Sequence, residues 1–142
     1  MTHHYIRTKI VLAWAAEGKD GAPGYGVKYA DGYTSWSPKA AFEESYRDIE
    51  GDNQSLNFGD ALHMLKLGKK VARAGWNGKG MFLFLVPGST FQVSRAPLLG
   101  IYPEGTEVNY CPHIDMRTAD GKIVPWLCSQ TDALAEDWRV TI

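Results

Sequence analysis

The chain has 142 residues, of which 44% are hydrophobic and 22% are charged, and its formal net charge is −1. This composition is typical of a globular protein and excludes the broad positive charge that captures duplex nucleic acid, although it still allows a local basic pocket for one small anion. No apolar run reaches the ~18 residues of a membrane-spanning helix and no signal peptide is evident, so we expect a cytoplasmic protein without a membrane partner.

The N-terminal region predicts a small β-β-β-α unit. Its strands are expected over residues 5–15, 25–29 and 33–36. The pair Asp31-Gly32 indicates a hairpin turn, because glycine accepts a positive φ there. Ser37 and Pro38 favour the start of a helix, with the serine as N-cap, the proline at the first helical position and residues 40–46 as the body.

A polar, glycine-containing run over residues 50–55 is typical of a linker. We therefore predict two parts, an N-terminal extension over residues 1–52 and a main domain over residues 53–142. The extension is too short to form a stable core by itself.

The main domain begins with a predicted helix. Asn57 and Asp60 have the spacing of a capping box, and Gly68 stands where a glycine usually ends a helix. The residues between them place one apolar stripe along the helix, formed by Phe58, Ala61, Leu62 and Leu65.

The remaining residues predict an antiparallel, β-dominated sheet, which makes the fold class α+β. Strands are expected over residues 81–86, 90–93, 108–116, 123–127 and 138–142, with a short helical segment over residues 133–136. We expect the second of these strands to pair with the first. Pro112 places the third at an edge or a bulge, and Asp120-Gly121 predicts a hairpin turn.

One stretch combines a glycine-rich turn with an apolar strand. The turn, residues 71–80, presents Arg73, Trp76, Asn77 and Lys79, which are two cations, an indole and an amide. The apolar run that follows it is typical of a strand covered on both faces. A buried strand behind such a turn is typical of one wall of a ligand pocket.

Catalytic chemistry has one candidate cluster. Cys111, His113 and Asp115 alternate on a predicted strand and would share one face, which suits a nucleophile with a base or three metal ligands. No oxyanion-site signature and no HExxH or CxxC spacing accompanies them. We therefore expect no metal and no cofactor, hydrogen-bonding roles for His113 and Asp115, and two reduced thiols, Cys111 and Cys128.

Several motifs in a fixed order carry a family resemblance. They are RAGWNGKGM, PHIDM, the DG turn, PWLCSQTD and EDW. Over residues 57–140 the chain resembles the phage family that counteracts Thoeris immunity, the second type of Thoeris anti-defence protein. Residues 5–47 fall outside the shared region.

The resemblance implies a binding protein rather than an enzyme. Such proteins act as sponges in the infected bacterial host: they sequester the glycocyclic ADP-ribose signal of a TIR-domain protein, so that the downstream effector is never switched on. Some relatives also bind cyclic oligonucleotides of cyclase-based (CBASS) immunity. The resemblance further implies homotetramers of small β-rich protomers, with ligand pockets at subunit interfaces.

Candidate ligand contacts follow from the adenine, ribose and pyrophosphate groups of such a signal. Trp76 offers a stacking surface, Arg73 a bidentate charge and Lys79 a point charge for phosphate. The amides of Asn77 and Asn109 can bind adenine edges or ribose hydroxyls.

Further candidate hydroxyl or base partners are His113, Asp115, Ser129, Gln130 and Asp132. Phe84 and Trp126 complete the candidate set, although large rings are usually buried in a core. Two rival classes remain open. One is a hydrolase of a nucleotide signal that uses His113 and Asp115, and the other is a module that binds a host protein through exposed aromatic residues.

Overall fold

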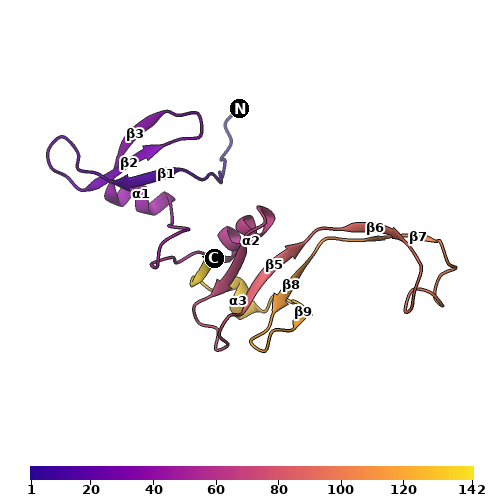
Figure 1. Cartoon of the computed structure of the whole chain (residues 1–142). Helices are drawn as coiled ribbons and strands as arrows, with labels where there is room; N and C mark the ends of the chain where they lie inside the picture. The colour runs from indigo at the N-terminus through magenta and orange to yellow at the C-terminus, as the bar shows by residue number, and fades with distance from the viewer. The chain divides into compact units, whose positions relative to one another are not determined.

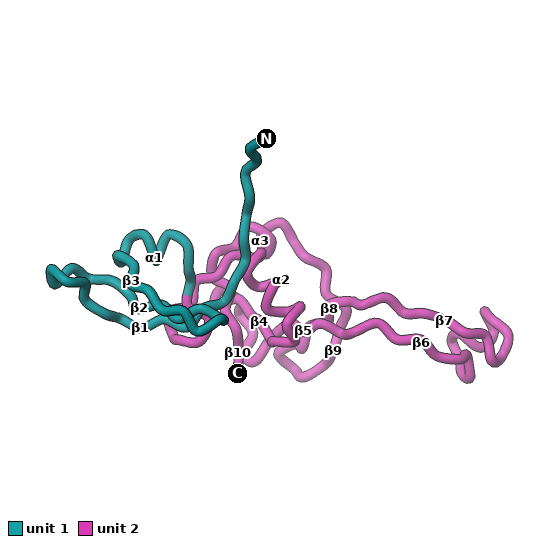
Figure 2. The backbone as a smooth tube through the Cα atoms, turned by 90° about the horizontal axis from the view of Figure 1, so that it is seen from above, with its two compact units in different colours: residues 1–47 teal, residues 48–142 magenta.

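The computed structural model describes residues 1–142 and divides them into two compact units, Met1–Arg47 and Asp48–Ile142 (Figure 2). The division falls a few residues before the boundary expected from the polar run. All strand pairs within the sheets are antiparallel and the helices are few, which confirms the α+β, β-dominated fold class. None of the helices combines the length and apolar character needed to cross a membrane.

The first unit is a three-stranded sheet with one short helix. Its elements are β1 (Leu12–Ala15), β2 (Gly24–Lys28), β3 (Thr34–Pro38) and α1 (Lys39–Ser45), and the strand order is β1-β2-β3. A row of stacked rings packs α1 onto the sheet, with ring centroids 4.2 Å apart for Tyr25 and Phe42 and 4.8 Å apart for Phe42 and Tyr46. On the other face, the indole of Trp14 lies against Gly26 and leaves no room for a side chain there.

Two predictions for this unit were wrong in detail. The first strand starts at Leu12 rather than at residue 5, because Leu12 pairs with Lys28 and the β2–β3 turn leaves no neighbour for the residues before it. Ser37 does not cap α1: it belongs to β3, opposite Tyr25, and the N-cap position is Pro38, which offers no side-chain hydrogen bond. Strand pairing thus outweighed the local helix-start signal.

The second unit is built on a five-stranded sheet with the order β10-β4-β5-β8-β9 (Figure 1). Its strands are β4 (Lys70–Arg73), β5 (Phe82–Val86), β8 (His113–Arg117), β9 (Ile123–Pro125) and β10 (Trp138–Thr141). Two helices accompany the sheet, α2 (Phe58–Lys66) and α3 (Gln130–Leu134).

Helix α2 has the ends that the sequence predicts. The Asn57 side chain accepts a hydrogen bond from the Asp60 amide at 2.8 Å, and the Asp60 carboxylate accepts one from the Asn57 amide at 3.2 Å, which completes a capping box. At the other end Gly68 has a φ of 84°, and its amide donates to the Leu65 carbonyl. The amide of Lys69 donates to the Met64 carbonyl, so the helix ends in a Schellman motif.

The core lies between α2 and one face of the sheet. Its fully buried side chains come from α2, β4, β5, β10 and the segment before α2: Leu56, Ala61, Leu65, Val71, Leu83 and Trp138. Part of the run predicted as a linker is built into this fold, because the Gln54 side chain both donates to and accepts from the Val140 backbone, at 3.2 and 2.7 Å.

The strand β5 is not covered on both faces, as the apolar run had suggested. Leu83 is fully buried, whereas Phe82 and Phe84, which point the other way, are half-buried. Helix α2 packs on β5 from the Leu83 side. The opposite side, the outer face, therefore shows two rings to solvent within the protomer.

Strand pairing places further side chains on the outer face. Phe82 pairs with Arg117, Phe84 with Asp115 and Val86 with His113, so these β8 side chains share the face of the two rings. At the other edge Ala72 pairs with Arg139 and Lys70 with Thr141. The outer face thus carries phenylalanine rings at its centre and basic side chains on both sides of them.

The segment predicted as residues 90–93 does not pair with β5, which is a correction. It forms β6 (Ser89–Gln92), whose partner is β7 (Glu107–Tyr110). The long strand predicted over residues 108–116 is interrupted at Cys111 and Pro112, so that β7 and β8 separate. Together β6, β7 and the tip between them form an arm, residues 87–112, that projects away from the sheet in both views (Figures 1 and 2).

Candidate anion-binding groove

A depression of about 650 Å³ lies over the end of the five-stranded sheet, where the turn of residues 74–81 meets β4 and β10. Five basic side chains line this groove: Lys70, Arg73, Lys79, Arg117 and Arg139. No aspartate or glutamate lines it. A concave surface lined by several basic side chains and by no acidic side chain is suited to an anion.

The turn that forms one side of the groove is fixed by Asp137. Its carboxylate accepts from the Gly75 amide at 2.8 Å, and its carbonyl accepts from the Ala74 amide at 3.0 Å. A side chain at residue 75 would meet the Asp137 carboxylate, and Gly80 at the far end has a φ of 71°. The glycines of the turn are therefore required by its geometry.

Arg73 holds two carboxylates rather than standing free. Its Nε donates to Asp137 at 2.8 Å and its Nη1 donates to Asp132 at 2.8 Å, while all three side chains are at least half-buried. The hydrogen bonds that Arg73 donates to Asp137 and Asp132 raise its pKa. The charge of this arginine is therefore balanced within the protein.

The two carboxylates are stabilised in their charged forms. The hydrogen bond from Arg73, helped by the Gly75 amide, lowers the pKa of Asp137. Burial alone would raise the pKa of Asp132, but hydrogen bonds from Arg73, Trp76 and Ser129 outweigh it and lower the pKa. Both groups remain ionised at neutral pH.

Trp76 lies where the groove meets this ion-pair cluster. Its Nε1 donates to Asp132 at 3.2 Å, and its ring packs edge-on against Trp138 with centroids 5.4 Å apart. The indole is half-buried and lines the groove, so its position is set by one hydrogen bond and one ring contact while part of it stays accessible.

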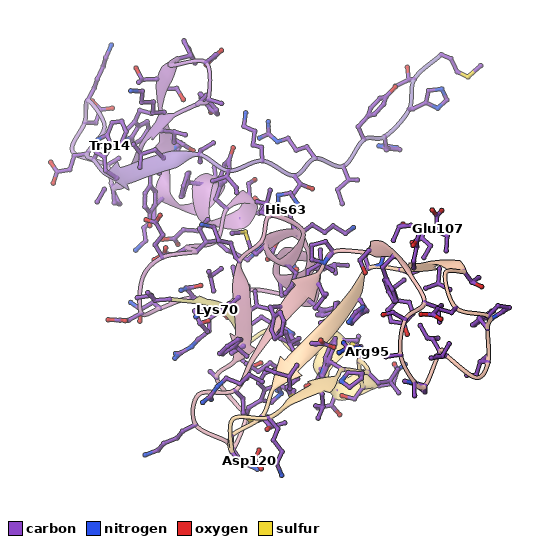
Figure 3. All side chains as sticks on the ribbon, turned by 45° about the vertical axis from the view of Figure 1, so that its right-hand side comes forward. Trp14, His63, Lys70, Arg95, Glu107 and Asp120 are labelled. Carbon is purple, nitrogen blue, oxygen red and sulfur yellow. The ribbon has the colours of Figure 1, made fainter.

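The remaining cations differ in how far they are engaged. Lys70, labelled in Figure 3, donates to the Ile142 carbonyl at 2.9 Å and lies 4.7 Å from the Phe82 ring centroid (Figure 3). Arg117 donates to the Gly80 carbonyl at 2.9 Å. Lys79 and Arg139 are exposed and make no hydrogen bond or ion pair with the rest of the chain. These last two charges are available to a ligand.

One hydroxyl in the groove has no partner. Thr141 lines the depression, and its Oγ1 atom is buried without a hydrogen bond. Buried polar atoms are almost always hydrogen-bonded, so this hydroxyl retains an unused hydrogen-bonding capacity at the edge of the cationic depression.

The structure brings only part of the predicted site together. Four of the candidate residues line the groove, namely Arg73, Trp76, Asn77 and Lys79. Asp132 adjoins them through its hydrogen bonds, and Ser129 caps α3 by accepting from the Asp132 amide at 3.0 Å. Gln130 is exposed at the start of the same helix.

The other candidates lie elsewhere. Phe84 is on the outer face beside Phe82, with ring centroids 6.1 Å apart, but does not line the groove. Trp126 packs against Phe58 and Trp138 at the core. Asn109 is exposed on β7 in the arm.

Of the candidate cluster Cys111, His113 and Asp115, only the His113 and Asp115 side chains lie close together. His113 Nε2 lies 3.5 Å from Asp115, and its Nδ1 lies 3.2 Å from the Cys111 carbonyl, so both ring nitrogens are engaged. Cys111 sits in the break between β7 and β8 rather than on a shared strand face, and no group of three metal-ligating side chains converges in the chain. Burial, together with the nearby Asp132, raises the pKa of the other thiol, Cys128.

Four groove residues were missed from the sequence, namely Lys70, Arg117, Arg139 and Thr141. Asp137, which fixes the turn beside the groove, was also missed. Alternation along the last strand does place Arg139 and Thr141 on one face. Only the pairing of β10 with β4 shows that this face is the one beside the glycine turn.

A helix-backed antiparallel sheet with a cationic groove defines a small α+β domain suited to anionic ligands. The Thoeris anti-defense 2-like domain family matches residues 56–141, and the chain belongs to this family. It is 45% identical over 85 residues to a Bacillus phage SP01 protein named "Thoeris anti-defense 2", an overlap that covers 60% of this chain and 93% of that protein. The second unit is thus a phage anti-Thoeris domain, and the first unit lies outside the match.

Proposed function

We propose that the second unit sequesters glycocyclic ADP-ribose, or a related cyclic nucleotide signal of the host, without cleaving it. Thoeris signalling would then stop because its effector never meets its activator. The observation that carries the proposal is the groove, which is lined by five basic side chains, by no aspartate or glutamate, and by the half-buried indole of Trp76.

The groove has the chemistry that such a ligand requires. Its volume of about 650 Å³ falls within the ~300–1,000 Å³ typical of small-molecule sites. Lys79 and Arg139 supply two uncompensated charges for a pyrophosphate, and Thr141 supplies a hydroxyl that lacks a partner. The rings of Trp76 and Phe82 offer surfaces for adenine, and the Asn77 amide can bind its edge.

Retention of the intact signal is supported by what the groove lacks. His113 and Asp115, the pair that a hydrolase would use, do not line it, and both histidine nitrogens are engaged. Arg73 in this proposal positions the turn through Asp132 and Asp137 rather than serving as the main phosphate ligand.

The test is capture followed by release. Protein incubated with glycocyclic ADP-ribose, separated from free ligand and then heated should return the unchanged compound by mass spectrometry. Recovery of a linear or hydrolysed product would identify an enzyme instead. Lys79→Ala should weaken capture about tenfold or more through loss of a charge-assisted contact. Lys122→Ala is the matched control, since Lys122 is paired with Asp120 on the β8–β9 turn outside the groove.

We further propose that the domain works as a homo-oligomer, with a tetramer favoured. A sponge with nanomolar affinity requires ~12 kcal/mol, which favours an enclosed site over a groove that is open within one protomer. The arm supports this, because an isolated two-stranded ribbon is marginally stable in water. It also exposes large apolar side chains: Phe91, Leu99, Ile101, Tyr102 and Tyr110. A second copy of the chain would cover them.

Ile101→Asp should therefore reduce the oligomer, because Ile101 at the arm tip is 69% exposed in the protomer and the proposed assembly would bury the new charge. Light scattering after gel filtration should show a smaller assembly with an unchanged protomer fold by circular dichroism. Leu134→Asp, at a comparably exposed residue of α3, is the control. An unaltered mass for the Ile101 variant would place the arm outside the interface.

A further inference from the structure

The first unit has a small depression of its own, about 230 Å³ in volume, where the N-terminal segment passes the end of α1. It is lined by Arg7, Lys9, Ser45 and Tyr46. Nothing about this unit follows from the family match, which begins at residue 56.

The position of Lys9 follows from the sheet. Tyr25 and Val27 are two residues apart on β2, so both side chains point to the face that packs against α1. They pair with Ala15 and Ala13 of β1. The segment before β1 brings Lys9 to the same side, where its Nζ lies 4.0 Å from the centroid of the Tyr29 ring. Lys9 is therefore held by a cation–π contact at the rim of the depression.

The hydroxyl of Tyr46 is the unusual group. Its ring is fixed by stacking on Phe42, which in turn stacks on Tyr25. Its Oη atom is buried and has no hydrogen-bond partner in the chain. A buried hydroxyl without a partner is unfavourable, so this atom needs an acceptor or donor from outside the protein.

The charges around this hydroxyl select an anion. The lining offers two cations and two hydroxyls and no carboxylate, while the Glu43 carboxylate is held by the Tyr25 hydroxyl at 2.8 Å. The C-terminus of α1 nearby carries only about half a negative charge, which two full positive charges outweigh. All four side chains can donate to an oxyanion.

We propose that this depression binds a single phosphate group, either inorganic phosphate or the terminal phosphate of a small monoester. Its volume equals that of about eight waters and falls below the range typical of whole small-molecule ligands, so a complete nucleotide does not fit inside it. A phosphate fills the space and gives the Tyr46 hydroxyl its missing acceptor.

The experiment is a phosphate titration of the full chain at constant ionic strength, followed through the amide resonances of Lys9, Ser45 and Tyr46. Saturable shifts are expected with inorganic phosphate, and chloride should produce none. Tyr46→Phe keeps the ring stack but removes the hydroxyl, and should weaken phosphate binding about tenfold through loss of one charge-assisted hydrogen bond. A nucleoside 5′-monophosphate that binds more tightly than phosphate assigns a monoester, and equal affinity assigns free phosphate.

Two further variants serve as controls. Tyr33→Phe removes an exposed hydroxyl of the same unit and should leave binding unchanged. Arg139→Ala removes a free cation of the groove and should also leave these resonances unaffected, which separates the two anion sites. Linear shifts of equal size with chloride and phosphate, or full binding by Tyr46→Phe, would overturn the proposal. So would a loss of stability in Tyr46→Phe, which would reveal a structural partner for the hydroxyl.

Discussion

Replacing Trp76 with alanine should raise the dissociation constant for the captured signal about 10- to 100-fold. The indole is the largest ring in the groove, and base–aromatic stacking contributes ~1–3 kcal/mol per base. Isothermal titration calorimetry with glycocyclic ADP-ribose measures the change directly. Because Trp76 also packs on Trp138 and donates to Asp132, stability must be recorded beside affinity.

Two companion variants separate stacking from structure. Trp76→Phe retains a ring for adenine and for Trp138 but loses the hydrogen bond to Asp132, so it should keep most of the affinity. Trp14→Ala removes an exposed indole from the first unit and should not change capture. If Trp76→Ala binds as tightly as the unaltered protein while remaining folded, the indole is not part of the ligand site.

Replacing Arg73 with alanine should lower the free energy of unfolding by about 2–3 kcal/mol, because two half-buried carboxylates lose their counter-charge. For a domain of this size the melting temperature should fall by at least about 8 °C. Arg139→Ala is the matched control: this arginine lines the same groove without an ion pair, and its loss should change stability by less than about 0.5 kcal/mol. Equal effects of the two variants would contradict a stabilising role for the Arg73 cluster.

The Arg73 effect should depend on pH in a defined direction. The pKa values of Asp132 and Asp137 are lowered in the folded state, so their contribution is complete above the unfolded-state value of about 4. This contribution to stability is lost as the pH falls through the lowered pKa values that the two aspartates have in the folded state. The stability difference between the unaltered protein and Arg73→Ala should stay constant from about pH 7 to 5 and narrow below about pH 4, as measured by urea unfolding.

Features encoded by neighbouring residues were predictable from the sequence. The capping box of Asn57 and Asp60, the glycine that ends α2 and the Asp120-Gly121 turn depend on contacts within a few residues, and each has the predicted form. Four side chains of the glycine turn that the sequence singled out, Arg73, Trp76, Asn77 and Lys79, line the same groove.

Features set by distant residues were not predictable. Residues 90–93 have the pattern of a strand, but nothing local shows that their partner is β7 rather than β5. The sequence predicts Arg73 as a phosphate ligand. In the fold, α3 and β10 place Asp132 and Asp137 against it, and these carboxylates occupy its guanidinium. Arg139 and Thr141 enter the groove only because β10 pairs with β4, more than 60 residues away in the chain.

The hydrogen bond between Lys70 and the Ile142 carbonyl has a practical consequence for work on this protein. It draws Ile142 to the rim of the groove, beside Thr141. Residues that follow Ile142, such as an affinity tag, would emerge at the rim of the groove and compete with any ligand proposed to enter it. Purification handles are therefore better attached before Met1, and assays on carboxy-terminally tagged material should be repeated after proteolytic tag removal.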